Sequence, residues 1–150
     1  SLIFSRQNLP HQQRDEATLT AIQRGGYVLR DCEGTPEAIL IATGSEVGLV
    51  MVAAEALARE GRNIRVVSMP CVEVFEQQSA EWRDSVLPPA VRTRLAVEAG
   101  STVGWHRYVG MDGAVIGLDR YGESGPGDQL FKHFGFTPER VTQTVREMLK

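Results

Sequence analysis

The chain has 150 residues, of which 42% are hydrophobic and 23% charged, and its formal net charge is −3. This length suits one domain that buries roughly 70% of its unfolded surface, and the balanced composition excludes a disordered, fibrous or disulfide-dense protein. Charges are scattered and form no basic runs, so we expect no nucleic-acid partner, because phosphate-backbone affinity needs a clustered positive surface.

The cysteines and the lengths of the apolar runs indicate the cellular compartment of the protein. Cys32 and Cys71 lie outside any CxxC or Cys/His ligand spacing, which indicates a reducing environment and no structural zinc. No apolar run approaches the roughly 20 residues that span a bilayer, and a signal-peptide profile is missing. We therefore expect a cytoplasmic protein with no membrane partner. Because the chain begins Ser-Leu-Ile-Phe without an initiator Met, we expect a fragment or a processed product.

The first 24 residues indicate the end of one unit and a linker. Residues 2–4 resemble the end of an apolar strand, residues 16–22 allow one or two helical turns, and Gly25 and Gly26 break them. Residues 27–31 and 38–42 are rich in Val, Leu and Ile around a Gly-Thr-Pro turn, so we predict a hairpin whose first strand lies antiparallel at a sheet edge. The second run is continuously apolar, as in a strand covered on both faces.

The middle of the chain predicts a βαβ unit. Apolar residues recur at helical spacing from 47 to 58, with Ser45 as the expected N-cap and Gly61 as the stop. Residues 64–69 form the next strand, which Pro70 closes. A strand, a helix and a strand within about 32 residues predict a right-handed crossover between parallel strands.

The remainder alternates in the same way. We expect a short helix at residues 71–78, a second helix capped by Ser79, a strand at 94–98, and glycine-rich loops at 100–127 around a strand at 115–118. Thr137, Pro138 and Glu139 begin a last helix. The predicted fold class is α/β: a three-layer sandwich with a five-stranded, mainly parallel sheet over residues 25–150.

Two segments are candidates for binding. Gly44 and Ser45 follow a buried strand and open a helix whose leading amides could receive an anion, although the segment lacks the spacing of a dinucleotide or phosphate loop; a purely structural turn is the alternative. Residues 105–108 (Trp-His-Arg-Tyr) suit an interface, because Trp, Tyr and Arg dominate contact energies, or else half-buried packing. We assign His106 no catalytic role, since no Ser or Cys nucleophile motif accompanies it.

The remaining polar candidates carry less weight. His11 and His133 have no neighbours at metal-ligand spacing, so we expect structural or surface roles and no metal site. Glu98 and Glu123 could form a catalytic carboxylate pair only if the fold brought them together.

Arg6 is the strongest candidate for a binding residue, because it follows a strand end, where α/β sheets open their ligand crevices, and a guanidinium binds phosphate bidentately. A surface arginine is the alternative.

A series of short segments carries a family resemblance. The segments SRQNLP (5–10), GGYVL (25–29), IATGSE (41–46), VVSMP (66–70), SVLP (85–88) and GES (122–124) occur in this order along almost the whole chain. Together they resemble transketolase. A related thiamine-dependent protein, such as deoxyxylulose phosphate synthase or the beta subunit of pyruvate dehydrogenase, and a free-standing anion-binding or interaction module are the alternatives.

The resemblance implies a function and a division of the chain. Residues 1–24 would close the pyrimidine-binding domain and form a linker, and residues 25–150 would be the C-terminal domain. Arg6 would contact the phosphate of the sugar-phosphate substrate. The implied enzyme is a homodimer of the pentose phosphate pathway that uses thiamine diphosphate and Mg²⁺ to move a two-carbon ketol unit between ketose and aldose phosphates. The family's cofactor-binding and catalytic motifs would lie upstream of Ser1, so the chain alone would bind no cofactor and be inactive.

Overall fold

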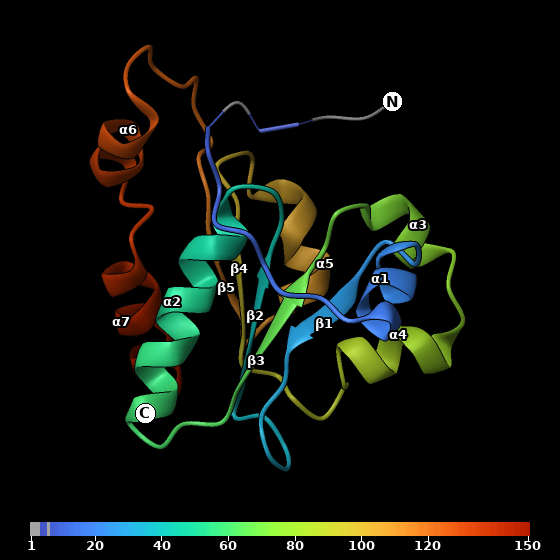
Figure 1. Ribbon diagram of the computed structural model, residues 1–150. Coiled ribbons are helices and arrows are strands. Elements are labelled where there is room, and N and C mark those ends of the chain that lie inside the picture. Colours follow the sequence, from blue (N-terminus) through green and yellow to red (C-terminus); the bar gives the residue numbers. More distant parts are fainter. Residues whose placement is uncertain (1–3, 6) are drawn as a thin grey trace.

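The computed structural model describes residues 4–5 and 7–150. Five strands form one sheet with helices on both faces (Figure 1). The strands are β1 (Tyr27–Arg30), β2 (Ala38–Ala42), β3 (Ile64–Ser68), β4 (Arg94–Val97) and β5 (Ala114–Ile116). The helices are α1 (Glu16–Ile22), α2 (Glu46–Arg59), α3 (Val72–Glu76), α4 (Ala80–Val86), η1 (Val103–Trp105), α5 (His106–Val109), α6 (Gly127–Phe134) and α7 (Pro138–Met148). The strand expected at residues 2–4 falls largely outside the described residues, and Phe4 itself is not in a strand.

The strands are ordered β1-β3-β2-β4-β5. β1 runs antiparallel to β3, while β3, β2, β4 and β5 run parallel to their neighbours. The βαβ unit from β2 through α2 to β3 is as predicted. The predicted three-layer α/β class with one antiparallel edge strand is therefore confirmed.

The predicted hairpin between the first two strands is wrong. Tyr27 of β1 lies opposite Ser68 of β3, and β2 pairs with β3 and β4 instead. β2 is buried over its whole length, so it is most stable with a parallel strand on each side. The chain from Asp31 to Glu37 consequently passes the start of β3 before it enters the centre of the sheet.

Two apolar cores lie on opposite faces of the sheet, because side chains alternate along a strand. Ala38, Leu40 and Ala42 of β2 face one core, which α2 and α7 cover. Ile39 and Ile41 face the other, which α3, α4 and α5 cover. In Figure 1, α2, α6 and α7 accordingly lie on one side of the sheet and α3, α4 and α5 on the other.

Helix ends follow the predicted signals in most cases. The hydroxyl oxygens of Thr137 and Ser79 each accept a hydrogen bond from a backbone amide of the first turn, at 3.3 Å. Gly61 adopts a φ of +82° just after α2, a conformation that glycine reaches without steric strain. These contacts fix where α2, α4 and α7 begin or end.

The glycine-rich region contains more helix than predicted. We expected loops at residues 100–127 around one strand at 115–118, and the structure instead has η1 and α5 before a strand at Ala114–Ile116. The turn of η1 and α5 is held by burial of Trp105, Tyr108 and Val109 in the second core. Tertiary packing thus overrides the low helix propensity of the surrounding glycines.

Candidate functional site

The carboxyl ends of the parallel strands gather several loops at one edge of the sheet. β2, β3 and β4 end at Ala42, Ser68 and Val97 and lie side by side. The chain leaves β2 for β3 on one side, and later reaches β4 on the other side of β2. In open α/β sheets such a reversal at the carboxyl edge is where ligands bind, so we call this region the carboxyl edge.

Gly44 and Ser45 lie at this edge, but Ser45 is not the cap that the sequence predicts. Its backbone is already helical, and its side chain forms no cap hydrogen bond. The hydroxyl instead donates to the Glu46 carboxylate at 2.6 Å. The first amides of the turn, those of Glu46 and Val47, bond to the carbonyls of Thr43 and Gly44 at 3.2 and 3.4 Å. An anion site at Gly44 and Ser45 stays a prediction.

Glu46 is a buried carboxyl group that the sequence did not single out. Only 4% of the residue is exposed. Burial raises the pKa of Glu46, against hydrogen bonds from the Ser45 hydroxyl and the Ala99 amide, and nearby Glu98 raises the pKa further. Glu98 in turn accepts a hydrogen bond from the Trp105 indole. An acid in the first turn of a helix ordinarily complements the helix dipole at the surface, so no sequence signal distinguished this one.

The segment from Trp105 to Tyr108 has two buried and two exposed side chains. Trp105 and Tyr108 are buried, with ring centroids 5.9 Å apart, whereas His106 and Arg107 are exposed. Arg107 forms an ion pair with Glu76 at 2.9 Å. The aromatic pair therefore anchors this segment to the chain's own core, and the predicted interface role rests on His106 and Arg107 alone.

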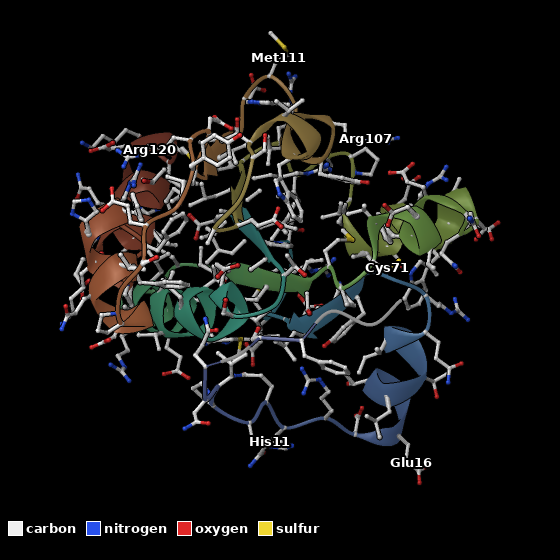
Figure 2. The ribbon with its side chains drawn as sticks, turned by 90° about the horizontal axis from the view of Figure 1, so that it is seen from above. His11, Glu16, Cys71, Arg107, Met111 and Arg120 are labelled. Carbon is white, nitrogen blue, oxygen red and sulfur yellow. The ribbon has the colours of Figure 1, made fainter. Side chains whose placement is uncertain are left out.

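The structure does not bring Glu98 and Glu123 together as a pair. Glu123 interacts with Arg120 and with His133, whose Nε2 lies 3.8 Å from the carboxylate, while Glu98 is bonded to Trp105. The two carboxylates thus have separate partners. His11 is exposed on the linker, away from Arg107 and Cys71 in the view from above (Figure 2).

Arg6 lies outside the described residues, and its two neighbours in the chain are at the carboxyl edge. The Ser5 hydroxyl oxygen is 3.8 Å from the position that a Cβ on Gly44 would take. Gln7 and Ser45 line a common cavity of about 230 Å³.

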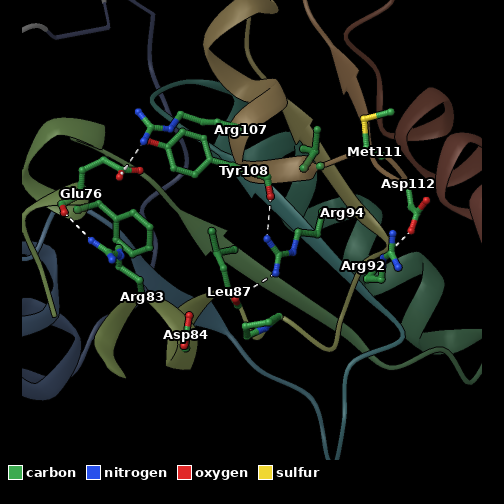
Figure 3. A pocket seen from close by; sticks show the side chains of 14 residues that line it. Glu76, Arg83, Asp84, Leu87, Arg92, Arg94, Arg107, Tyr108, Met111 and Asp112 are labelled. Atoms are coloured by element: carbon green, nitrogen blue, oxygen red, sulfur yellow. Dashed lines mark hydrogen bonds and ion pairs between the residues drawn. The ribbon is translucent and has the colours of Figure 1, made fainter. Parts of the chain in front are cut away.

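A cavity of about 510 Å³ lies between α3, α4, α5 and the segments that precede β4 and β5 (Figure 3). Its central cation, Arg94, donates to the carbonyls of Val91, Tyr108, Leu87 and Pro88 at 2.8 to 3.0 Å. Burial lowers the pKa of Arg94, and burial with neighbouring Glu76 raises the pKa of Tyr108 to about 12. Because its donors already serve backbone carbonyls, Arg94 ties loops together and is not free to bind a ligand.

The described residues contain neither a metal-binding cluster nor a membrane-spanning helix. Within residues 4–5 and 7–150, no group of three His, Cys, Asp or Glu side chains is placed to hold a metal ion. Over the same residues, no helix is both long and apolar enough to cross a membrane.

The sheet order, the antiparallel edge strand and the loops gathered at the carboxyl edge define a doubly wound, three-layer α/β domain. Within that class, residues 25–137 match the family described as the transketolase-like TK C-terminal domain. The chain belongs to this family.

Individual relatives agree with this assignment. Transketolase 2 of Aliivibrio fischeri and transketolase 1 of Escherichia coli are 54% and 53% identical to the chain over 149 residues. This match covers 99% of the chain but only 22% of each relative. The structure of transketolase from Leishmania mexicana superimposes with a TM-score of 0.86 at 38% identity, and that of the Pichia stipitis enzyme in complex with sedoheptulose 7-phosphate with 0.84 at 39%. Each structural match covers 96% of the chain and 20% of the solved structure.

Proposed function

We propose that the chain acts as the C-terminal part of a transketolase, which transfers a two-carbon ketol unit between ketose and aldose phosphates. The observation that carries this proposal is the 54% identity to a transketolase over 99% of the chain. This identity favours transketolase over the other thiamine-dependent enzymes considered. Residues 1–24 would close the preceding domain and residues 25–150 would form the last one.

The chemistry of such an enzyme would lie outside this chain. Thiamine diphosphate supplies the nucleophile and the electron sink of ketol transfer when it is bound, and the described residues offer no magnesium cluster. The chain would contribute surfaces that contact the other domains and the second subunit of a homodimer, His106 and Arg107 among them. It would not supply a catalytic residue.

Arg6 is proposed to bind the terminal phosphate of the sugar substrate. Its neighbours Ser5 and Gln7 lie at the carboxyl edge, beside Gly44 and Ser45, which is where α/β sheets bind ligands. A guanidinium can hold a phosphate dianion through two parallel hydrogen bonds. The reacting carbons of the sugar would then be positioned at a distance from Arg6. The solved relative bound to sedoheptulose 7-phosphate supports a sugar phosphate as the substrate class.

The test is Arg6→Ala in the complete enzyme that carries this chain. We expect kcat/KM for phosphorylated substrates to fall about thirtyfold, which corresponds to a loss of about 2 kcal/mol of binding free energy. Most of this fall should come from a higher KM. Unphosphorylated substrates should be little affected, because they lack the group that Arg6 binds. Arg59→Ala is the matched control, since the Arg59 side chain is 80% exposed and pairs with Glu55 at 3.8 Å. Equal weakening of both substrate types would remove this role from Arg6.

A further inference from the structure

A cavity of about 290 Å³ lies where the linker folds back onto the carboxyl edge. We call it the linker cavity. The linker packs closely there, because a Cβ on Gly48 of α2 would lie 3.7 Å from the ring of Pro10. The polar side chains that line the cavity come from the linker, from β1, from the start of α2 and from the end of β3: His11, Gln12, Arg14, Tyr27, Ser45 and Ser68.

The charge of the linker cavity is positive. Arg14 is among its lining residues, and no Asp or Glu is. Arg14 donates from Nε to the Tyr27 hydroxyl and from Nη1 to the Gln12 carbonyl, each at 3.1 Å, and neither acceptor carries a charge. No described carboxylate forms an ion pair with Arg14. The four residues outside the described part, Ser1, Leu2, Ile3 and Arg6, are not acidic either, so the chain leaves this cation unneutralised.

Ser68 gives an independent indication of a ligand. The residue is 5% exposed, and its hydroxyl forms no side-chain hydrogen bond with any described residue. Side chains alternate along a strand, so Ser68 lies on the same face as Val66, which packs in the core under α2. Ser68 therefore brings to the cavity a hydroxyl that no described side chain binds, and this hydroxyl can donate to a ligand.

The start of α2 adds to the same potential. This helix has 14 residues, and Gly44 and Ser45 at its positive end line the cavity. The carboxyl group of Glu46 does not belong to the lining. It is turned instead toward the Ser45 hydroxyl and the Ala99 amide, which follows β4. The helix dipole thus acts together with Arg14 on whatever occupies the cavity.

We propose that the linker cavity binds a small phosphate-type anion, with Arg14 and Ser68 as its principal donors. A volume of about 290 Å³ is at the lower end of the roughly 300–1,000 Å³ of pockets for drug-sized ligands, which favours inorganic phosphate or one phosphate group over a nucleotide. The bound anion would join the linker to the ends of β2 and β3. The donors of this proposed site are residues other than Arg6, and the proposal does not depend on ketol transfer.

The experiment is a calorimetric titration of the complete holoenzyme with inorganic phosphate, in an Arg6→Ala background that removes the proposed substrate contact. We expect one phosphate per chain beyond the bound cofactor. Arg14→Gln should weaken this binding at least about tenfold, and Ser68→Ala about threefold, because each removes one donor. Arg24→Gln is the matched control: it removes the same charge, but Arg24 stacks on the Trp82 ring at 4.2 Å and is not part of the cavity lining.

The outcomes separate cleanly. Unchanged phosphate affinity in both Arg14→Gln and Ser68→Ala, or no binding of millimolar phosphate by the parent, would overturn the proposal. If Arg14→Gln lowers the melting temperature of the protein without ligand, the phosphate affinity of Ser68→Ala decides whether the proposal holds. Ser68→Ala removes only one oxygen atom and is therefore the smaller structural change. Ribose 5-phosphate distinguishes the two sources of the anion. Displacement of phosphate by it supports a sugar phosphate as the ligand, and lack of displacement supports the free ion.

Discussion

Replacing Glu46 with Gln should make the stability of the chain less sensitive to pH. Glu46 is 4% exposed, and its carboxylate accepts a hydrogen bond from the Ser45 hydroxyl at 2.6 Å. Burial is the largest influence on this group, and it raises the pKa of Glu46. Glutamine has nearly the same shape and can accept the same hydrogen bond, but it carries no charge to be desolvated.

The sign follows from proton linkage. Between the ordinary pKa of 4.5 and the raised pKa in the folded chain, the folded state holds more protons at Glu46 than the unfolded state. The free energy of unfolding therefore falls as pH rises through this window, by up to about 1.4 kcal/mol per pH unit. Below the window the contribution of the group is fully present, and above it the loss is complete and constant.

The assay is urea unfolding of residues 1–150 from about pH 4 to about pH 8. Glu46→Gln should remove this part of the slope and be more stable than the parent at neutral pH. Glu55→Gln on the same helix is the control, because Glu55 has a 55% exposed side chain that faces Arg59, and exposed pairs contribute about 0–1 kcal/mol. If the parent and Glu46→Gln lost the same free energy across the window, the assignment of a raised pKa to Glu46 would be wrong.

Two further predictions concern the last helix and the activity of the chain alone. Thr137→Ala should lower the free energy of unfolding by about 1 kcal/mol, because the Thr137 hydroxyl caps α7. Thr144→Ala, at a half-buried position in the middle of α7, removes no cap and should change the free energy of unfolding less. Equal effects of the two changes in urea unfolding would contradict the cap. Purified residues 1–150 should show no ketol transfer with thiamine diphosphate and magnesium. Turnover above the buffer rate in a coupled assay would show that the chain holds chemistry that we place elsewhere.

Local patterns predicted the elements whose own residues determine them. The continuous apolar run of β2 and the helical spacing that starts at Val47 are properties of single segments, and both segments formed as expected. The cap at Thr137 is equally local, because its hydrogen bond reaches only three residues along the chain, to Arg140. Such features need no knowledge of the partners of a segment.

Pairing and packing were less predictable because they depend on distant residues. The hairpin prediction assumed that β1 pairs with its neighbour in sequence, whereas Tyr27 pairs with Ser68, 41 positions further on. The helical turn through Trp105 and Tyr108 was hidden by glycines on both sides, and the core side chains that stabilise it, such as Phe75, come from other elements. Glu46 lies near Glu98 and Ala99, which follow β4. These contacts require β4 to pair with β2, so the sequence around Glu46 does not predict them.

The candidate site shows the same division. Gly44 and Ser45 were singled out as the start of a helix, and the structure does place them at a cavity. Arg14 was not singled out, because a lone arginine in a polar linker has no sequence context. Ser68 was counted as part of a strand. Only the folding of the linker onto the carboxyl edge brings Arg14, Ser68 and the start of α2 to the same cavity.

Another cavity at the carboxyl edge is lined by more acidic than basic residues, and it shows by comparison which charge the linker contributes. That cavity, of about 350 Å³, has Glu73, Glu98 and Arg107 as its charged lining residues, and Cys71 also lines it. The linker cavity lies on the other side of the sheet, toward α2, and its charged lining residue is Arg14, which the linker supplies. An anion that reaches this edge is therefore attracted to the linker side and repelled by the carboxylates on the other. Without the linker, the sheet and α2 would bring only the Ser68 hydroxyl and the helix start to this proposed site, and no cation. The linker therefore supplies the positive charge of the site, in addition to its proposed role of joining two domains.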